Sequence, residues 1–323
     1  MTNFTLGLTF KTNSFKEIKI ITKTKESMKK LINFIKNNRF FYTLFLPIIK
    51  LKRIRGLRSF SNFDTLFSNV LGGSIVVSVN NIPGRYEIDS RSHLLKEILI
   101  KKEYEPHIVQ RIKQNAPVNT DAINIGANIG FYSNLLAELI NKDKKVLAIE
   151  PTPGAFKLLE ANIKRNNHCN KIIAYNGIAT DTPGLSTMNI IEGKEEYSSV
   201  GVISHFAVEK EKVIEVGVQG DTIDNLVKKF NLQPGIIVMD VEGFEFQVLT
   251  GAIETIRKFK PIIITELSDE LLKNLNSNSL QIVELLEMND YFIMDAENSK
   301  LSFPFKSGNI IAFPNSLKGL DIH

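Results

Sequence analysis

The sequence predicts an α/β protein with a doubly wound, mostly parallel seven-stranded sheet, preceded by an N-terminal helical and hairpin extension. Two observations carry this prediction. Apolar runs of four to seven residues alternate with helix-length segments from residue 121 almost to the end of the chain. Such nearly continuous apolar strands are typical of a parallel sheet that is covered by helices on both faces.

The segments before this alternation have a different character. Residues 24–37 favour a helix, "GGSIVVSVNN" and "GRYEID" form a hairpin around "IPG", and one helix is expected near 92–115. The expected divisions are a basic extension, a hairpin-and-helix segment, the main domain and a tail, at 1–70, 71–120, 121–316 and 317–323.

Within the main domain, strands and helices alternate with short links. The expected strands are 122–125, 145–150, 171–176, 235–240, 261–267, 291–295 and 309–314. The expected helices are about 130–141, 153–167, 221–231, 243–258 and 277–288. Because only a short polar link separates the last two strands, we expect them to form an antiparallel pair that closes the sheet edge.

Composition excludes several classes of protein. The chain of 323 residues is 43% apolar and 23% charged, as in an ordinary globular protein. Its single cysteine, Cys169, excludes a disulfide framework and a multi-cysteine metal site. No histidine cluster accompanies the acidic residues, and we predict no metal ion.

The positive net charge of +5 arises in the N-terminal segment, where residues 1–70 hold 14 Lys and Arg against 3 Asp and Glu. The apolar run at 40–49 followed by "KLKRIRGLR" at 50–58 fits peripheral contact with an anionic membrane, at the inner membrane face. The alternative is a helical extension that packs on the main domain. No run is long enough to span a bilayer, no nucleic-acid motif is present, and we expect a cytoplasmic protein.

The first strand of the main domain leads into a glycine turn, "DAINIGANIGFYS" at 121–133. Gly126 lets the backbone approach a ligand closely, and Gly130 lets the following helix pack tightly. The spacing is neither that of a dinucleotide turn nor that of a P-loop. The second strand ends in Glu150, which is placed to accept hydrogen bonds from ribose hydroxyls; a helix-capping role is the alternative.

Further acids follow two later strands. Asp240 and Glu242 are two residues apart on an expected extended segment, so both side chains point to the same side. Two close carboxylates raise one pKa and make a better proton acceptor, whereas acids at a helix N-terminus are the structural alternative. Glu266 ends a buried strand, where an acid is costly unless it is bonded or functional.

These motifs together resemble a known family. "INIGANIGFYS", "AIEPTPGAFKLLEANIKRN", "DTIDNL", "MDVEGFEFQVLTGAIETI", "PIIITEL" and "GNIIAFP" resemble the FkbM family of S-adenosylmethionine-dependent methyltransferases, over about 100–316. The most specific element is D-V-E-G-F-E. The resemblance implies a Rossmann-like, class I methyltransferase fold, S-adenosyl-L-methionine as cofactor, and O-methylation of sugars and other hydroxylated compounds.

The resemblance also implies roles for individual residues. It places the turn around the methionine part of the cofactor, Glu150 on the ribose, and the stretch at 176–181 near the adenine. Asp240 is expected to face both the methyl group and the acceptor, flanked by Glu242 and Glu266. The residues implied to bind cofactor are Asn124, Gly126, Ala127, Asn128, Gly130, Glu150, Asn176 and Asp181, the last two being alternative partners of the adenine amino group.

One residue departs from the family pattern. Asn124 stands where the family usually has an aspartate that helps hold the positively charged methionine end. Asp121 cannot replace it, because it faces the opposite side of the strand about 10 Å away. A unit charge at about 4 Å is worth up to about 4 kcal/mol at an effective dielectric of 20, so we expect weaker cofactor binding.

The function predicted is therefore transfer of a methyl group to a hydroxyl of a sugar, glycan or glycolipid precursor. Asp240 is the expected base, Glu242 or Glu266 tunes it or orients the acceptor, and His205 in the insert at 186–219 is an alternative base. Tyr104 and Glu105 either close over the methyl pocket or serve packing and surface roles. A weakly active or inactive binding module and a nucleotide-dependent oxidoreductase are the competing hypotheses.

Overall fold

The computed structural model describes residues 6–11, 17–22, 73–191, 198, 213–297 and 307–319. The chain divides into two compact units, Met1–Ser74 and Ile75–His323. In the first unit, β1 (Leu6–Lys11) and β2 (Glu17–Thr22) pair antiparallel, a hairpin that the sequence analysis did not predict. The expected helix at 24–37 and the membrane segment at 40–58 lie outside the described residues.

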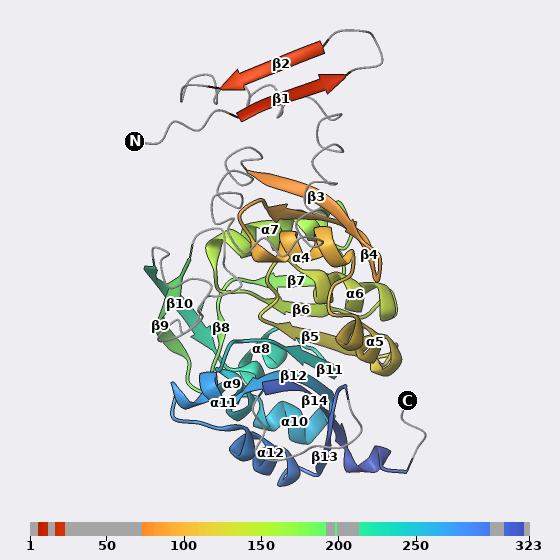
Figure 1. The fold of residues 1–323 in the computed structure, drawn as a ribbon. Helices are drawn as coiled ribbons and strands as arrows, with labels where there is room; N and C mark the ends of the chain where they lie inside the picture. The colour runs from red at the N-terminus through yellow and green to blue at the C-terminus, as the bar shows by residue number, and fades with distance from the viewer. Residues whose placement is uncertain are drawn as a thin grey trace. The chain divides into compact units, whose positions relative to one another are not determined.

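The second unit contains the predicted seven-stranded sheet, in the order β13-β14-β12-β11-β5-β6-β7 (Figure 1). Its strands are β5 (Asp121–Ile125), β6 (Val146–Ile149), β7 (Ile172–Tyr175), β11 (Pro234–Met239), β12 (Ile262–Ser268), β13 (Tyr291–Asp295) and β14 (Ser307–Pro314). Neighbouring strands are parallel except at β14, which is antiparallel to both β12 and β13. The doubly wound, mostly parallel architecture is confirmed, and so is the antiparallel pair at its edge.

Helices cover both faces of this sheet. One hydrophobic core holds Ala122 of β5, and the opposite core holds its neighbours Ile123 and Ile125. The helices that bury apolar side chains in the first core are α4 (His93–Lys101), α5 (Pro106–Asn115), α6 (Phe131–Leu139) and α7 (Pro153–Arg165). Those that bury apolar side chains in the second core are α8 (Ile223–Lys229), α9 (Glu245–Thr250), α10 (Ile253–Phe259), α11 (Asp269–Lys273) and α12 (Ser279–Glu287).

Two predicted helices are each broken in two. The segment expected as one helix at 92–115 forms α4 and α5, because Lys102 adopts a left-handed conformation (φ 59°) and Pro106 starts a new helix. The segment expected at 243–258 forms α9 and α10. A Cβ on Gly251, between them, would lie 2.0 Å from the carbonyl oxygen of Thr180, so only glycine permits this close backbone approach.

The turn of the predicted hairpin lies at residues 80–81, directly before the expected link at 82–84. β3 (Ser74–Val79) and β4 (Ile82–Asp89) are joined by Asn80 and Asn81, so "IPG" lies inside β4 and not in the turn. The Asn81 side chain is held by the distant backbone of Tyr104: its Oδ1 accepts from the Tyr104 N–H at 3.0 Å, and its Nδ2 donates to the Tyr104 carbonyl at 2.5 Å. This contact fixes the link between α4 and α5.

The ends of the insert expected at 186–219 are strands. β8 (Ile178–Ala179), β9 (Gly184–Ile190) and β10 (Ile214–Asp221) form a small sheet in the order β8-β10-β9. His205, the alternative base, lies outside the described residues. A short 3₁₀ helix, η3 (Asn315–Leu317), follows β14.

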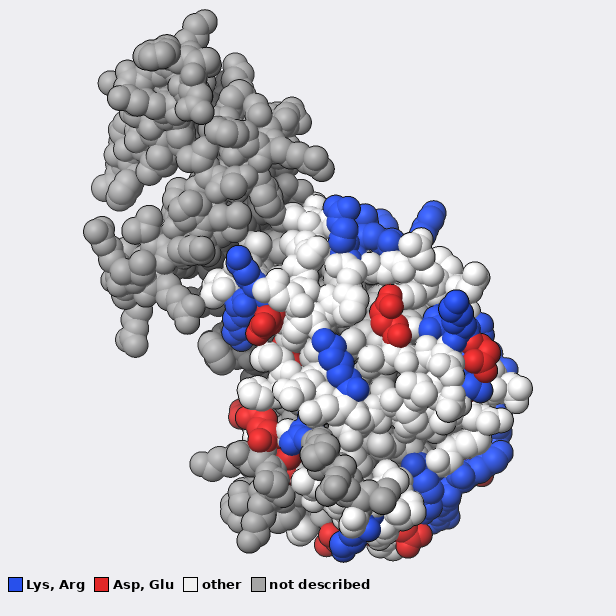
Figure 2. Space-filling model, turned by 90° about the vertical axis from the view of Figure 1, so that its right-hand side faces the viewer, with Lys and Arg blue, Asp and Glu red and all other residues white. Residues whose placement is uncertain are grey.

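None of the helices in the described ranges combines the length and hydrophobicity that crossing a bilayer requires. On the described part of the face shown in Figure 2, Lys and Arg side chains form separate groups interrupted by acidic and uncharged surface. A groove that follows a nucleic-acid backbone needs a continuous basic stripe, and this face does not present one.

We predict that Asp121 stabilises the sheet at the end opposite the glycine turn. This buried carboxylate accepts hydrogen bonds from the N–H groups of Lys145 and Gln233, each at 2.7 Å, just before β6 and β11. Asp121→Ala should lower the free energy of unfolding by about 2 kcal/mol, because both N–H groups lose their acceptor. Urea denaturation measures this change. Asp143→Ala, at an exposed carboxylate, is the control and should leave the midpoint unchanged. A midpoint for Asp121→Ala equal to that of the wild type would contradict the prediction.

Candidate active site

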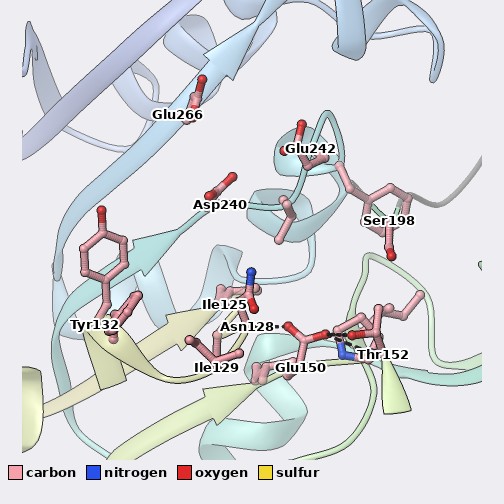
Figure 3. A pocket seen from close by; sticks show the side chains of 18 of the residues that line it. Ile125, Asn128, Ile129, Tyr132, Glu150, Thr152, Ser198, Asp240, Glu242 and Glu266 are labelled. Carbon is pink, nitrogen blue, oxygen red and sulfur yellow. Dashed lines mark hydrogen bonds between the residues drawn. The ribbon is translucent and has the colours of Figure 1, made fainter. Parts of the chain in front are cut away.

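A cavity of about 240 Å³ opens at the carboxyl ends of β5, β6, β11 and β12 (Figure 3). This is the edge of a doubly wound sheet where ligands bind. Of the residues that the sequence predicted for the site, the cavity is lined by Gly126, Ala127, Asn128, Glu150, Asp240, Glu242 and Glu266. The structure thus brings together the residues that end four different strands.

The glycine turn after β5 is held tightly against its neighbours. The N–H groups of Gly126 and Ala127 both donate to the Ile149 carbonyl, at 3.0 and 2.8 Å. Gly126 has φ +73°, and a Cβ at this position would lie 1.8 Å from the carbonyl oxygen of Asp240. The close approach that requires glycine is therefore to the backbone of Asp240, which is how the turn reaches the end of β11.

Glu150 is fixed in one orientation at the cavity wall. The residue is 5% exposed, and its carboxylate accepts hydrogen bonds from the N–H groups of Asn128 and Thr152, each at 2.8 Å. The Thr152 hydroxyl donates a third, at 2.6 Å. Figure 3 shows these contacts at the side of the pocket that is remote from Glu266. A carboxylate held by backbone donors is preorganised to receive a ligand hydroxyl.

The other end of the cavity is strongly acidic. Burial, together with the charges of Glu242 and Glu266, holds the pKa of Asp240 well above its usual range. The carboxyl of Glu266 also has a raised pKa, because of partial desolvation and the charge of Glu105. The expected extended segment at Asp240–Glu242 is wrong: β11 ends at Met239, and Glu242 lies in a turn with φ 51°. Both carboxylates nevertheless line the cavity.

Two tyrosines and Glu105 complete the acidic end. Tyr104 and Glu105 line the cavity, and the Tyr132 hydroxyl donates a hydrogen bond to the Glu105 carboxylate. The Tyr104 ring packs against Phe131 and Tyr132, with ring centroids 4.7 and 5.3 Å apart. Burial raises the pKa of Tyr132 well above its usual range, so this phenol stays protonated and acts as a donor. Tyr132 belongs to the aromatic pair after the glycine turn, and the sequence pattern alone predicts no role for it.

The end beside Glu150 is apolar. Ile178, Met188 and Phe244, from the small sheet and the start of α9, line it. The Ser198 side chain is 6% exposed and also lines the cavity, and its hydroxyl has no hydrogen-bond partner among the described residues. Ile178 lies in the stretch at 176–181 that the sequence predicted to approach the adenine. Sequence reasoning gave no role to Met188, Phe244 and Ser198, because no local pattern shows which side chains of the insert and of the turn before α9 meet at the sheet.

Asn124 lies outside the cavity lining. Its side chain is buried on the α6 side of the sheet, where its Oδ1 accepts from the Ser133 hydroxyl at 2.7 Å. Its Nδ2 donates to the Val238 carbonyl at 3.4 Å. Both polar atoms of the amide that replaces the usual aspartate therefore have protein partners.

Three other predicted cofactor residues also lie outside the lining. A Cβ on Gly130 would lie 2.7 Å from Leu159 Cδ1, so this glycine permits α6 to pack on α7 as expected. The Asn176 amide donates to the carbonyl oxygens of Glu150 and Pro151, at 2.9 and 3.2 Å. Asp181 is exposed. Their roles toward the cofactor stay predictions.

The cavity fits the cofactor that the sequence predicts. Its described lining includes six carboxylates, from Glu97, Glu105, Glu150, Asp240, Glu242 and Glu266, and no Lys or Arg. Such a lining suits the positively charged sulfonium and ammonium groups of S-adenosylmethionine. The apolar end, with the fixed Glu150 and the unpartnered Ser198 hydroxyl, suits a nucleoside. Within the described residues, no group of three or more His, Cys, Asp or Glu could hold a metal ion.

Comparison with known proteins agrees with this chemistry. The family model described as "Methyltransferase FkbM domain" matches residues 124–293, and no curated protein matches the chain. A solved FkbM methyltransferase from Methylobacillus flagellatus KT is 19% identical, with a TM-score of 0.40 over 60% of this chain; the match spans 43% of that longer protein. Precorrin-6y C5,15-methyltransferase from Geobacter metallireducens GS-15 is 14% identical, with a TM-score of 0.36 over 65% of this chain and 89% of its own. TYW2 of M. jannaschii, solved in complex with AdoMet, is 12% identical, with a TM-score of 0.37 over 74% of this chain and 84% of its own.

The oxidoreductase hypothesis fails on this comparison, because the matched family is one of methyltransferases. The match covers just over half of the chain and includes the glycine turn, Glu150, Asp240 and Glu266. The protein belongs to the FkbM family of methyltransferases, and its cofactor is S-adenosylmethionine.

Proposed function

We propose that this methyltransferase acts on a hydroxyl of a sugar, glycan or glycolipid precursor. The observation that carries the proposal is Asp240, a carboxylate at the end of β11 whose pKa is raised well above its usual range. A hydroxyl is a weak nucleophile until its proton is removed, and a carboxylate of raised pKa is a stronger base for that step. An acceptor that was already a good nucleophile would not need such a group.

The side chains of the cavity divide the work. When bound, S-adenosylmethionine supplies an electrophilic methyl group. Glu150, held by Asn128 and Thr152, would bind the ribose hydroxyls. Asp240 accepts the proton of the acceptor hydroxyl as the acceptor oxygen gains the methyl group, and the neutral carboxyl that results is no longer repelled by the carboxylates around it.

The groups that set the basicity of Asp240 come from several elements. The acids that raise the pKa of Asp240 are Glu105 before α5, Glu242 and Glu245 around the start of α9, and Glu266 in β12. The phenols of Tyr104, before α5, and Tyr132, in α6, stay protonated because their pKa values are raised well above the usual range. Glu266 and Glu242 also remain candidates for orienting the acceptor.

The competing hypothesis, a weakly active or inactive binding module, rests on Asn124. The side-chain position of this residue argues against it. Asn124 is not a lining residue and contacts Ser133 and Val238, while the negative charge of the cavity comes from other residues. Loss of the aspartate at position 124 therefore leaves the acidic cavity lining intact.

We expect that Asn124→Asp will not tighten cofactor binding. The new carboxylate would be buried against the Val238 carbonyl, which cannot donate to it, so the free energy of unfolding should fall by about 3 kcal/mol. Calorimetric titration with S-adenosylhomocysteine and thermal unfolding measure the two quantities. Asn170→Asp, an exposed change of the same chemistry, is the control. Tenfold tighter binding in Asn124→Asp would show that the residue does face the cofactor.

Transfer of labelled methyl groups into a glycan and lipid extract tests the proposed activity directly. Asp240→Asn should reduce kcat/KM by about 10²- to 10⁴-fold, the usual contribution of a general base, and leave S-adenosylhomocysteine binding within about threefold. Since the carboxylate is the active form, wild-type kcat/KM should fall as the pH falls through the raised pKa, and Asp240→Asn should lose this acidic limb. Glu242→Gln is the matched control in the same cavity and should cost about tenfold. Full transfer by Asp240→Asn would exclude Asp240 as the base.

We also propose that residues 40–58 bind an anionic membrane surface, since apolar residues there precede five Lys and Arg residues at 50–58. Replacing these five with Gln should weaken sedimentation with phosphatidylglycerol vesicles by at least about tenfold, because each basic residue contributes about 1 kcal/mol near such a surface. Neutral phosphatidylcholine vesicles are the control. Equal sedimentation of the substituted and wild-type proteins would contradict the proposal.

A further inference from the structure

Glu105 reaches the cavity from outside the strand and helix alternation that forms the rest of the site. It lies in the link between α4 and α5, directly after Tyr104. The backbone of Tyr104 is held at both its N–H and its carbonyl by the Asn81 side chain, and its ring packs on Phe131 and Tyr132. The hairpin and the first turn of α6 thus fix the position from which Glu105 extends.

The conformation of Glu105 is unusual for its place in the chain. It is the residue before the first turn of α5, where side chains commonly cap the helix from an extended backbone. Glu105 instead has φ 31° and ψ 67°, and its side chain makes no capping bond. Its carboxylate accepts a hydrogen bond from the Tyr132 hydroxyl, inside the cavity.

This arrangement places Glu105 among the acids of the reacting end. A smaller hollow that adjoins the main cavity is lined by Glu105, Tyr132, Asp240 and Glu266 together. Figure 3 shows Tyr132, Asp240 and Glu266 on the side of the pocket away from Glu150, Thr152 and Ser198. Three carboxylates and a phenol from four separate elements therefore face the region where an acceptor would meet Asp240.

We propose that Glu105, positioned by Tyr132, is a specificity-determining residue of the acceptor site: it binds a hydroxyl donor of an uncharged acceptor and excludes acceptors that carry a carboxylate or phosphate beside the reacting hydroxyl. The inference rests on the proposed function. Carboxylates accept hydrogen bonds from hydroxyl groups and repel anions, and the described lining contains no Lys or Arg to offset this repulsion.

A matched pair of ligands tests the inference on the full-length protein saturated with S-adenosylhomocysteine. Methyl glucoside and methyl glucuronide differ only in a hydroxymethyl group against a carboxylate. Ligand-observed NMR titration at mildly alkaline pH should show at least about tenfold tighter binding of the glucoside, because the carboxylates of the lining repel the carboxylate of the glucuronide. Glu105→Gln should lower this ratio by at least about threefold, mainly through tighter binding of the glucuronide, while the carboxylates that remain in the lining keep some preference for the glucoside.

Glu103→Gln is the control, because Glu103 carries the same charge two residues earlier, is exposed and is not a lining residue. It should keep the wild-type ratio and the wild-type affinity for S-adenosylhomocysteine, and Glu105→Gln is likewise titrated at a saturating concentration of S-adenosylhomocysteine. Equal binding of the two glycosides by the wild type, no binding of the glucoside, or an unchanged ratio in Glu105→Gln would each overturn the inference. Absence of methyl transfer to any hydroxyl, with the binding preference intact, would overturn only the proposed function.

Discussion

The site depends on one close contact, that of the glycine turn after β5 with the end of β11. Gly126 lies so near the Asp240 carbonyl that a Cβ would approach it to 1.8 Å, and the Asp240 N–H donates to the Ile125 carbonyl at 3.0 Å. The turn is also bound to β6 through the Ile149 carbonyl. Because the ends of β5, β6 and β11 are held together here, the fixed Glu150 and the proposed proton acceptor Asp240 occupy opposite ends of one cavity.

The same packing concentrates negative charge. Six carboxylates line a cavity of about 240 Å³, and the pKa values of Asp240 and Glu266 are raised because of burial and the charges of neighbouring acids. Repulsion of this kind disfavours the empty site at neutral pH. A cation in the cavity relieves it, and so does a proton arriving on Asp240. Repulsion among the carboxylates therefore favours both cofactor binding and protonation of Asp240. A cationic cofactor bound nearby lowers the pKa of Asp240, which the neighbouring acids raise.

The features that could be predicted from the sequence are those that follow from local patterns of apolar and acidic residues. Continuous apolar runs located all seven strands of the main sheet, and acids at strand ends located Glu150, Asp240 and Glu266. Sequence reasoning failed where tertiary contacts decide. The break between α4 and α5 depends on a left-handed Lys102 and a distant Asn81, and the apolar end of the cavity is formed by a small sheet folded from the insert. Tyr132 was visible in the turn, but only the position of Glu105 shows what its hydroxyl contacts.

Asn124 illustrates how strand geometry limits inference from a family pattern. Side chains alternate along β5, so residue 124 shares the face of Ala122 and packs against α6, while Ile123 and Ile125 enter the opposite core. The cavity lies beyond the strand end, where turns with positive φ at Asn128 and Glu242 release the chain from this alternation. The charge at the cavity therefore comes from residues that follow strands, from Glu97 and Glu105 in and after α4, and from Glu266 in β12. Asn124, inside β5, contacts Ser133 of α6 and does not line the cavity, so its identity affects the packing of α6 before it affects the ligand.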